Sequence, residues 1–141
     1  MHQTIRWKLC LKSKPSKVFS YLTSTEGIEK FWAEKAEKKD GHIQFSFPNK
    51  QVYKSKILNQ EANKNFRIEY FNSIVDFNLS ENELGGTLME LVNSNVELED
   101  YHANYAGWVS VLMTLKAAVD FEVDLRNHDS QKTWDDGYMD N

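Results

Sequence analysis

The sequence predicts one α+β domain in which a curved antiparallel sheet of six to seven strands surrounds a long C-terminal helix. Three observations lead to this prediction. Residues 5–12 alternate apolar and polar side chains, and a helical pattern follows. From Ala33 to about Val96 several short segments alternate in the same way between Pro, Asn and Gly turns, which is typical of an antiparallel meander. From Glu99 to about Asn127, apolar residues recur every three or four positions, as in an amphipathic helix.

The N-terminal segment predicts a half-buried strand followed by two short helices. One face of the strand carries Ile5, Trp7, Leu9 and Leu11. Pro15 suits the first turn of a helix, because its missing N–H would have no helical partner there. Apolar residues at helical spacing then predict a first helix with Val18, Phe19 and Leu22, and a second with Ile28, Phe31 and Trp32.

The meander predicts one apolar face, to which each strand contributes alternate residues. Its inward set is expected to be Ile43, Phe45, Phe47, Tyr53, Ser55, Ile57, Phe66, Ile68, Tyr70, Val75, Phe77, Leu79, Met89 and Leu91. Arg67, Glu69 and Asp76 fall on the opposite face and are expected to form exposed cross-strand pairs.

The last helix is expected to bury one stripe, formed by Tyr101, Tyr105, Trp108, Leu112, Leu115, Val119 and Val123. Gly107 interrupts it, and a glycine inside a helix costs about 1 kcal/mol relative to alanine, so a packing reason such as close backbone approach is expected. Residues 1–127 then form the domain. The tail, residues 128–141, is polar and acidic but contains Trp134 and Tyr138; a disordered or loosely docked end is favoured over a docked tail or an interaction motif.

Composition excludes several classes of function. The net charge of −4 and the mixed signs along the chain argue against nucleic-acid binding. The single cysteine, Cys10, excludes an internal disulfide, and no apolar run is long enough to insert into a membrane. The N-terminus lacks the apolar core of a signal peptide, so the cytoplasm is the expected location. No histidine or cysteine has metal-ligand spacing and no phosphate-binding loop is present, so no metal or cofactor is predicted.

Two pairs of motifs resemble a known family. Pro15-x-x-Val18-Phe19-x-x-Leu22-Thr23 with Ile28-x-x-Phe31-Trp32, and Gly86-Thr87-x-Met89-x-Leu91 with Gly107-Trp108-x-x-x-Leu112-x-x-Leu115, look like the opening and closing parts of START-like (SRPBCC) proteins related to the activator of the heat-shock-protein-90 ATPase. The resemblance spans nearly the whole chain and implies the helix-grip, or Bet-v-1-like, fold. The chain departs from the family at Asn93, near which the family usually has a histidine in its last strand.

A helix-grip domain can leave an apolar cavity between its sheet and its long helix, so the leading hypothesis is a module that binds a small apolar or aromatic ligand such as a lipid. The residues expected to contact the ligand are Trp32, Phe45, Phe47, Tyr53, Ile68, Tyr70, Phe77, Met89, Trp108, Leu112, Leu115 and Val119, with His102 and Tyr105 as polar groups at the rim. The same side chains could instead fill a closed core, and the sequence leaves both possibilities open.

Two alternatives remain beside ligand binding. The resemblance implies a protein-interaction module like a co-chaperone, which would dock on a larger ATPase through the outer sheet face or the acidic tail. An enzyme of the cyclase or hydrolase kind ranks last, because it needs inward polar groups with shifted pKa values and the sequence offers few. No catalytic residue is therefore assigned, and the oligomeric state stays open.

Overall fold

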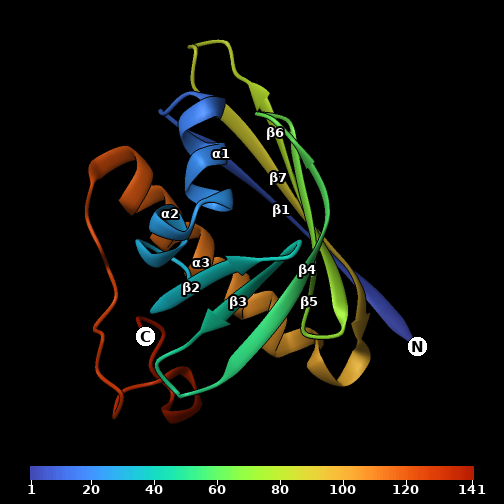
Figure 1. The fold of residues 1–141 in the computed structure, drawn as a ribbon, viewed down its shortest axis with the longest axis vertical. Coiled ribbons are helices and arrows are strands. Elements are labelled where there is room, and N and C mark those ends of the chain that lie inside the picture. The colour runs from blue at the N-terminus through green and yellow to red at the C-terminus, as the bar shows by residue number, and fades with distance from the viewer.

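A computed structural model describes residues 1–141 and confirms the predicted fold class. Seven antiparallel strands form one sheet in the order β1-β7-β6-β5-β4-β3-β2, and this sheet curls around the long helix α3 (Figure 1). Two short helices, α1 and α2, lie in the connection between β1 and β2. The strands are β1 (His2–Leu11), β2 (Lys35–Lys39), β3 (His42–Ser46), β4 (Val52–Glu61), β5 (Asn65–Tyr70), β6 (Ser73–Glu81) and β7 (Thr87–Glu97); the helices are α1 (Pro15–Thr23), α2 (Thr25–Glu29) and α3 (Tyr101–Phe121).

The predicted alternation sets the faces of the sheet. Phe45, Phe66 and Phe77 are fully buried on the inner face. On the outer face, Arg67 of β5 lies opposite Asp76 of β6 and forms an ion pair with it at 3.5 Å, as the cross-strand prediction requires. The start of β7 lies very close to β1, since a Cβ at Gly86 would stand 2.3 Å from the Leu11 carbonyl oxygen. The chain can make this approach only with glycine at that position.

The second short helix is shorter than predicted. It ends at Glu29, and Phe31 and Trp32 follow it in a turn that points both side chains into the core. The Ser24 hydroxyl accepts a hydrogen bond from the Gly27 N–H and begins this helix. Gly27 packs directly on the backbone of Tyr21, where a Cβ would meet the Tyr21 Cα at 2.4 Å. This close packing of α1 on α2 aims the following turn at the sheet.

The long helix ends six residues before the predicted boundary. Its last residue is Phe121, and Glu122 adopts a left-handed conformation with φ of 55°, from which its N–H bonds back to the helix. The sequence has no Gly or Pro at this point, so the usual stop signal is missing. Val123, which was expected in the buried stripe, lies beyond the helix and is 48% exposed.

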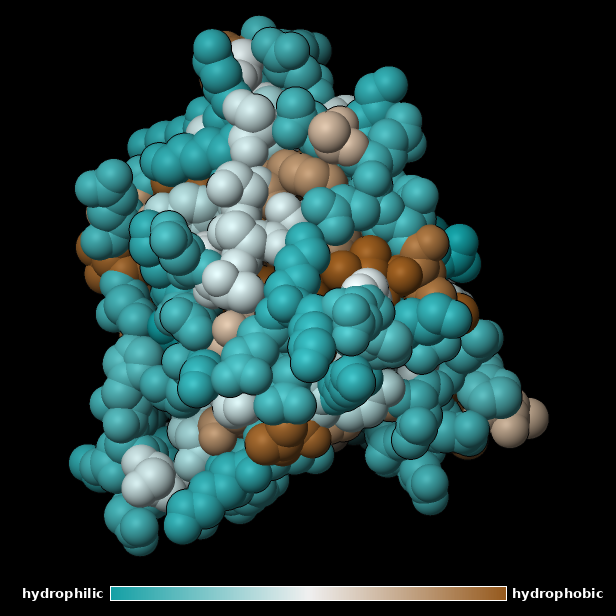
Figure 2. Space-filling view, in the orientation of Figure 1, coloured by the Kyte–Doolittle hydropathy of each residue, from teal (hydrophilic) through white to brown (hydrophobic).

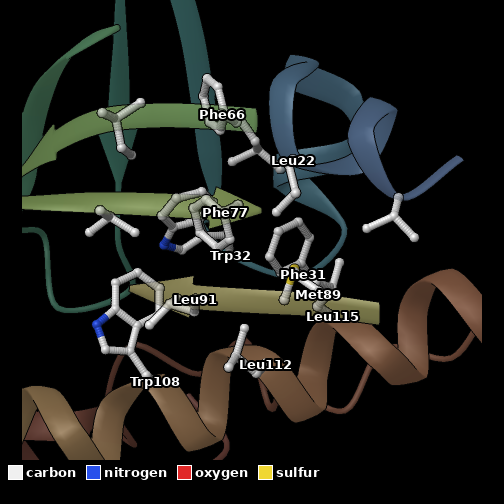
Figure 3. Packing of buried hydrophobic residues seen from close by; sticks show 14 of the residues in the cluster. Leu22, Phe31, Trp32, Phe66, Phe77, Met89, Leu91, Trp108, Leu112 and Leu115 are labelled. Carbon is white, nitrogen blue, oxygen red and sulfur yellow. The ribbon is translucent and has the colours of Figure 1, made fainter. Parts of the chain in front are cut away.

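The core lies between the inner face of the sheet and one side of α3. In Figure 3, Trp108 and Leu112 rise from α3 toward Trp32, Phe77 and Leu91. Asp120, in the last turn of α3, accepts hydrogen bonds from the backbone N–H groups of Lys12 (2.8 Å) and Ser13 (3.0 Å). These bonds fix the C-terminal end of the helix to the connection between β1 and α1.

After α3 the chain turns back and runs beside α2 toward the turns at the ends of β3 and β5 (Figure 1). The Arg126 guanidinium donates hydrogen bonds to the carbonyl oxygens of Glu29 and Ala33. Farther along, Ser110 of α3 donates to the Met139 carbonyl at 2.6 Å, and Asn49 donates to Asp135 at 2.9 Å. Asp135 belongs to a short 3-10 turn, Trp134–Asp136, which is closed by reciprocal bonds between Thr133 and Asp136.

Candidate ligand pocket

A cavity of about 420 Å³ lies at the end of the domain opposite the tight contact between α3 and α1. Its walls come from the N-terminal half of α3, the turns β3–β4 and β5–β6, the turn after α2, and the C-terminal tail. The lining side chains are Phe31, Trp32, Phe47, Pro48, Asn49, Gln51, Tyr70, Phe71, Asn72, Asn93, Asp100, Ala103, Asn104, Gly107, Trp108, Ser110, Val111, Thr114, Arg126, Trp134, Asp135 and Asn141.

The structure divides the predicted ligand contacts between this pocket and the core. Trp32, Phe47, Tyr70 and Trp108 line the pocket. Tyr53 is half-buried and stacks on Phe71 beside it, with ring centroids 4.4 Å apart. The remaining contacts are packed in the core and do not line the pocket: Phe45, Ile68, Phe77, Met89, Leu112, Leu115 and Val119. Phe45 and Phe77 pack directly behind the pocket wall, with ring centroids 4.6 and 5.5 Å from that of Trp32, so core and pocket share one aromatic layer.

The two predicted rim residues lie outside the pocket lining. His102 is exposed on α3. Tyr105 is 37% exposed and packs on Trp7 of β1, with ring centroids 4.7 Å apart. His102 lies six residues before Trp108 and so points about 120° away from it around α3. Tyr105 lies one turn before Trp108 and leans on Trp7 of β1 instead of on the pocket.

Gly107 was expected to allow a close backbone approach, and that expectation is wrong. A Cβ at this position would have no atom within 4 Å. Gly107 instead belongs to the pocket lining, next to Trp108, which is 4% exposed and contributes to both the core and the pocket wall. The missing side chain therefore leaves space in the cavity.

Asn93 joins the sheet to α3 at the floor of the pocket. Its side chain is 1% exposed; the carboxamide oxygen accepts from Trp108 Nε1 at 2.9 Å, and the nitrogen donates to Ser73 Oγ at 2.8 Å and to the Ile74 carbonyl at 3.0 Å. Each polar atom of this buried amide thus has a partner, as burial demands. Asn93 is thus a structural amide that orients Trp108.

Tyr70 contributes a hydroxyl to the same region. Its oxygen accepts a hydrogen bond from Trp32 Nε1 at 3.1 Å. Burial raises the pKa of this phenol, which outweighs the opposing effect of the Trp32 bond, so the hydroxyl stays protonated. Its own O–H donates to no protein acceptor, and the group is therefore able to donate to a molecule in the pocket.

The β5–β6 turn places Phe71 at the mouth of the pocket in an unfavourable backbone conformation. Phe71 and Asn72 both have positive φ, 44° and 62°. Two-residue hairpin turns of this kind favour Asn and Gly, and a bulky aromatic residue in the left-handed region costs about 1–2 kcal/mol. The Phe71 ring nevertheless stacks on Tyr53, and its centroid lies 6.0 Å from that of Phe47. The strained backbone therefore places Phe71 in an aromatic wall of the pocket.

A cluster of charges attaches the tail beside the pocket. Arg126 donates to both oxygens of Asp124 at 3.0 Å. Burial would raise the pKa of Asp124, but hydrogen bonds from Arg126 and His128 outweigh it and lower the pKa to about 2. His128 lies between Asp124 (2.7 Å) and Glu34 (2.7 Å), and its hydrogen bond to Asp124 is the main reason that its pKa is raised. Arg126 is thus already paired within the protein although it lines the pocket.

Several pocket residues were not predicted because they lie outside the periodic segments. Asn49, Phe71 and Asn72 come from turns, and Trp134 and Asp135 come from the tail. No alternation or helical spacing marks such positions, so only the tertiary structure brings them together. The one signal in the sequence is Trp134, an unusual aromatic residue in a polar tail.

Two further features of the structure bear on the class of site. No three His, Cys, Asp or Glu side chains come together in a way that could hold a metal ion. None of the helices combines the length and the apolar character needed to cross a lipid bilayer.

The sheet, the long helix and the cavity between them define a helix-grip domain of the START-like (SRPBCC) class. The family model described as "Activator of Hsp90 ATPase homolog 1-like protein" matches residues 12–120, which is most of the chain. The chain therefore belongs to this family, as the motifs predicted. No curated protein matches the chain significantly.

Solved structures agree on the fold. Protein SSP2350 from Staphylococcus saprophyticus is 20% identical, with a TM-score of 0.77 over 88% of this chain and 96% of its own. The Aha1 dimer from Colwellia psychrerythraea is 23% identical, with a TM-score of 0.75 over 84% of this chain and 97% of its own. EF2215 from Enterococcus faecalis is 21% identical, with a TM-score of 0.76, covering 86% of this chain and 73% of its own. At these identities the likeness establishes the architecture alone.

Proposed function

We propose that this protein binds a small, mainly apolar ligand in the pocket between α3, the two turns and the tail. The observation that carries the proposal is the combination of a cavity of about 420 Å³ with seven aromatic side chains in its wall: Phe31, Trp32, Phe47, Tyr70, Phe71, Trp108 and Trp134. Small-molecule sites are concave and mostly apolar, with a few polar groups that orient the ligand. Tyr70 and the carboxamides of the lining supply such groups.

Gly107 gives a direct test of this proposal. We would titrate purified protein with N-phenyl-1-naphthylamine, an uncharged dye whose fluorescence rises in apolar surroundings. A Gly107→Phe variant places a ring in the cavity, because a side chain at this position meets no protein atom within 4 Å of its Cβ. The matched control is Ala106→Phe, since Ala106 is exposed on the same helix and does not line the pocket.

We expect the wild type and the Ala106→Phe variant to bind the dye alike, and the Gly107→Phe variant to bind at least tenfold more weakly. Circular dichroism would establish that all three are folded. Absence of dye binding by the wild type, or equal binding by all three proteins, would overturn the proposal. If the dye does bind, native mass spectrometry of protein purified without detergent would identify the chemical class of any molecule retained from the cell.

A protein-interaction role is the second candidate, and membership of a family named after an activator of the heat-shock-protein-90 ATPase favours it. Val109 and Met113 are 41% and 51% exposed and lie four residues apart, so they share one face of α3 that the sheet does not cover. The test is stimulation of a purified heat-shock-protein-90 ATPase by the wild type and by a Val109→Ser/Met113→Ser variant. No stimulation by the wild type would remove this candidate.

The pocket offers little support for an enzyme. The lining group whose pKa is strongly shifted is Tyr70, and the shift keeps it protonated. Arg126 is already held by Asp124 and two backbone carbonyl oxygens. General acid–base catalysis needs a second group poised to exchange a proton with the first, and the geometry does not pair Tyr70 with one.

A further inference from the structure

The charges around the pocket favour some ligands over others. Asp100, at the start of α3, and Asp135, in the tail, both line the pocket, and neither forms an ion pair with Lys, Arg or His. Asp135 accepts a hydrogen bond from the neutral Asn49 amide, and the Asp100 side chain does not cap its own helix. Neither carboxylate is therefore paired with a cation of the protein.

The cation in the lining does not offset these charges for a ligand. Arg126 uses four of its five N–H donors on Asp124, Ala33 and Glu29, and its side chain is 5% exposed. Its charge is matched by Asp124, whose lowered pKa keeps it ionised. Lys50, in the β3–β4 turn, is exposed and does not line the pocket. An anionic ligand would thus meet two unpaired carboxylates and a guanidinium that is already engaged.

The inner surface of the pocket suits flat rings and offers one hydrogen-bond donor that has no acceptor within the protein. Trp32, Tyr70 and Trp108 lie against one another at angles of 43° to 61°, with centroids 5.4 to 6.1 Å apart, and all three line the cavity. Ring faces attract other rings and cations. The Tyr70 hydroxyl is a donor without a protein acceptor, and it suits a carbonyl, ether or hydroxyl oxygen on the ligand.

We propose that the pocket selects an uncharged or cationic ring-bearing ligand with a hydrogen-bond-accepting oxygen, and that it discriminates against carboxylates and other anions, fatty acids included. This inference rests on the proposed ligand-binding function and gives it a chemical class. Asp100 and Asp135 set the preference for charge, the aromatic wall sets the preference for rings, and Tyr70 sets the preference for an acceptor.

The test uses four probes that share one ring system and differ in charge or acceptor: 2-naphthamide, 2-naphthoate, 2-naphthylmethylammonium and 2-methylnaphthalene. Binding would be followed at pH 7.5 by displacement of N-phenyl-1-naphthylamine. Asp100 and Asp135 are both exposed, so water screens part of their repulsion. Because the two charges act together on one ligand, we still expect 2-naphthoate to bind about tenfold more weakly than 2-naphthamide. The ammonium compound should bind at least as tightly as the amide.

Two variants assign the preference to residues. Asp100→Asn/Asp135→Asn should narrow the gap between naphthoate and naphthamide to less than about threefold. Its control, Glu81→Gln/Glu83→Gln, removes two exposed charges near the β6–β7 turn, outside the pocket lining, and should leave the gap unchanged. Tyr70→Phe should weaken naphthamide severalfold while leaving 2-methylnaphthalene unaffected, because the hydrocarbon has no acceptor.

The possible failures can be told apart. If N-phenyl-1-naphthylamine itself does not bind, the proposed function is wrong. If the dye binds and naphthoate displaces it as well as naphthamide does, ligand binding stands and the charge preference is overturned. The requirement for an acceptor is overturned if 2-methylnaphthalene displaces the dye and 2-naphthamide does not. It is also overturned if Tyr70→Phe weakens the binding of both compounds alike.

Discussion

Replacing Asn93 by leucine tests whether a buried amide fixes the pocket wall. Leucine is close to asparagine in size but cannot make the three hydrogen bonds of this side chain. Trp108 Nε1 would lose its acceptor in a buried site, and the Ile74 carbonyl would lose one donor. Ser73 Oγ would still donate to the Tyr70 carbonyl at 2.6 Å, so its loss is smaller.

The expected cost follows from these losses. A buried donor left without a partner costs about 1–3 kcal/mol, and a lost hydrogen bond to a carbonyl costs about 1 kcal/mol. The Asn93→Leu variant should therefore be about 2–4 kcal/mol less stable than the wild type. This is a large part of the roughly 5–15 kcal/mol that stabilises an ordinary domain.

A double-mutant cycle separates the Trp108 contribution from the rest. Trp108→Phe removes the indole N–H, so in that background Asn93→Leu leaves no orphaned donor on α3. We expect its cost to fall by about 1–3 kcal/mol, measured by urea unfolding and far-ultraviolet circular dichroism. An equal cost in both backgrounds, within about 0.5 kcal/mol, would refute the claim that Asn93 acts through Trp108.

Three further predictions follow from the pocket and its surroundings. Gly107→Ala should raise the unfolding free energy by up to about 1 kcal/mol, because alanine favours the helix and its methyl group meets no atom; urea unfolding measures this. The raised pKa of His128 means that its bonds to Asp124 and Glu34 stabilise the fold fully below about pH 6.5 and less as the pH rises through the folded pKa, so the stability difference between wild type and His128→Gln should shrink from pH 6 to pH 9. Phe71→Asn should leave stability within about 1 kcal/mol of the wild type, since relief of the positive φ offsets the lost ring packing, while affinity for N-phenyl-1-naphthylamine falls.

Each of these three predictions can be contradicted by a specific outcome. A destabilised Gly107→Ala variant would mean that α3 makes an approach at this point that its surroundings do not indicate. A difference between wild type and His128→Gln that grows with pH would reverse the assigned sign of the coupling. Unchanged dye binding by Phe71→Asn would mean that the Phe71 ring does not contact the bound dye.

The periodic parts of the sequence determined the architecture. Alternation marked the buried faces of the strands, including Phe45, Phe66 and Phe77, and helical spacing marked the stripe of α3 through Trp108 and Leu115. These predictions were accurate because each element buries one face, and the period of its apolar residues records which face that is. The end of α3 at Phe121 was missed, because Glu122 adopts the left-handed conformation that glycine usually supplies.

The tertiary structure alone decided where a closed core gives way to a pocket. Sequence patterning treats Phe45 and Phe47 alike, yet Phe45 is fully buried in the core and Phe47 borders the cavity. The difference arises because Trp32 and Tyr70 cover Phe45, with ring centroids 4.6 and 5.7 Å away, whereas Phe47 lies farther along β3 beside Phe71 of the β5–β6 turn. Side chains from turns and tails carry no periodicity, so their meeting around Tyr70 and Trp108 depends on the folded chain. The residues that give the pocket its charge, Asp100 and Asp135, belong to this non-periodic set.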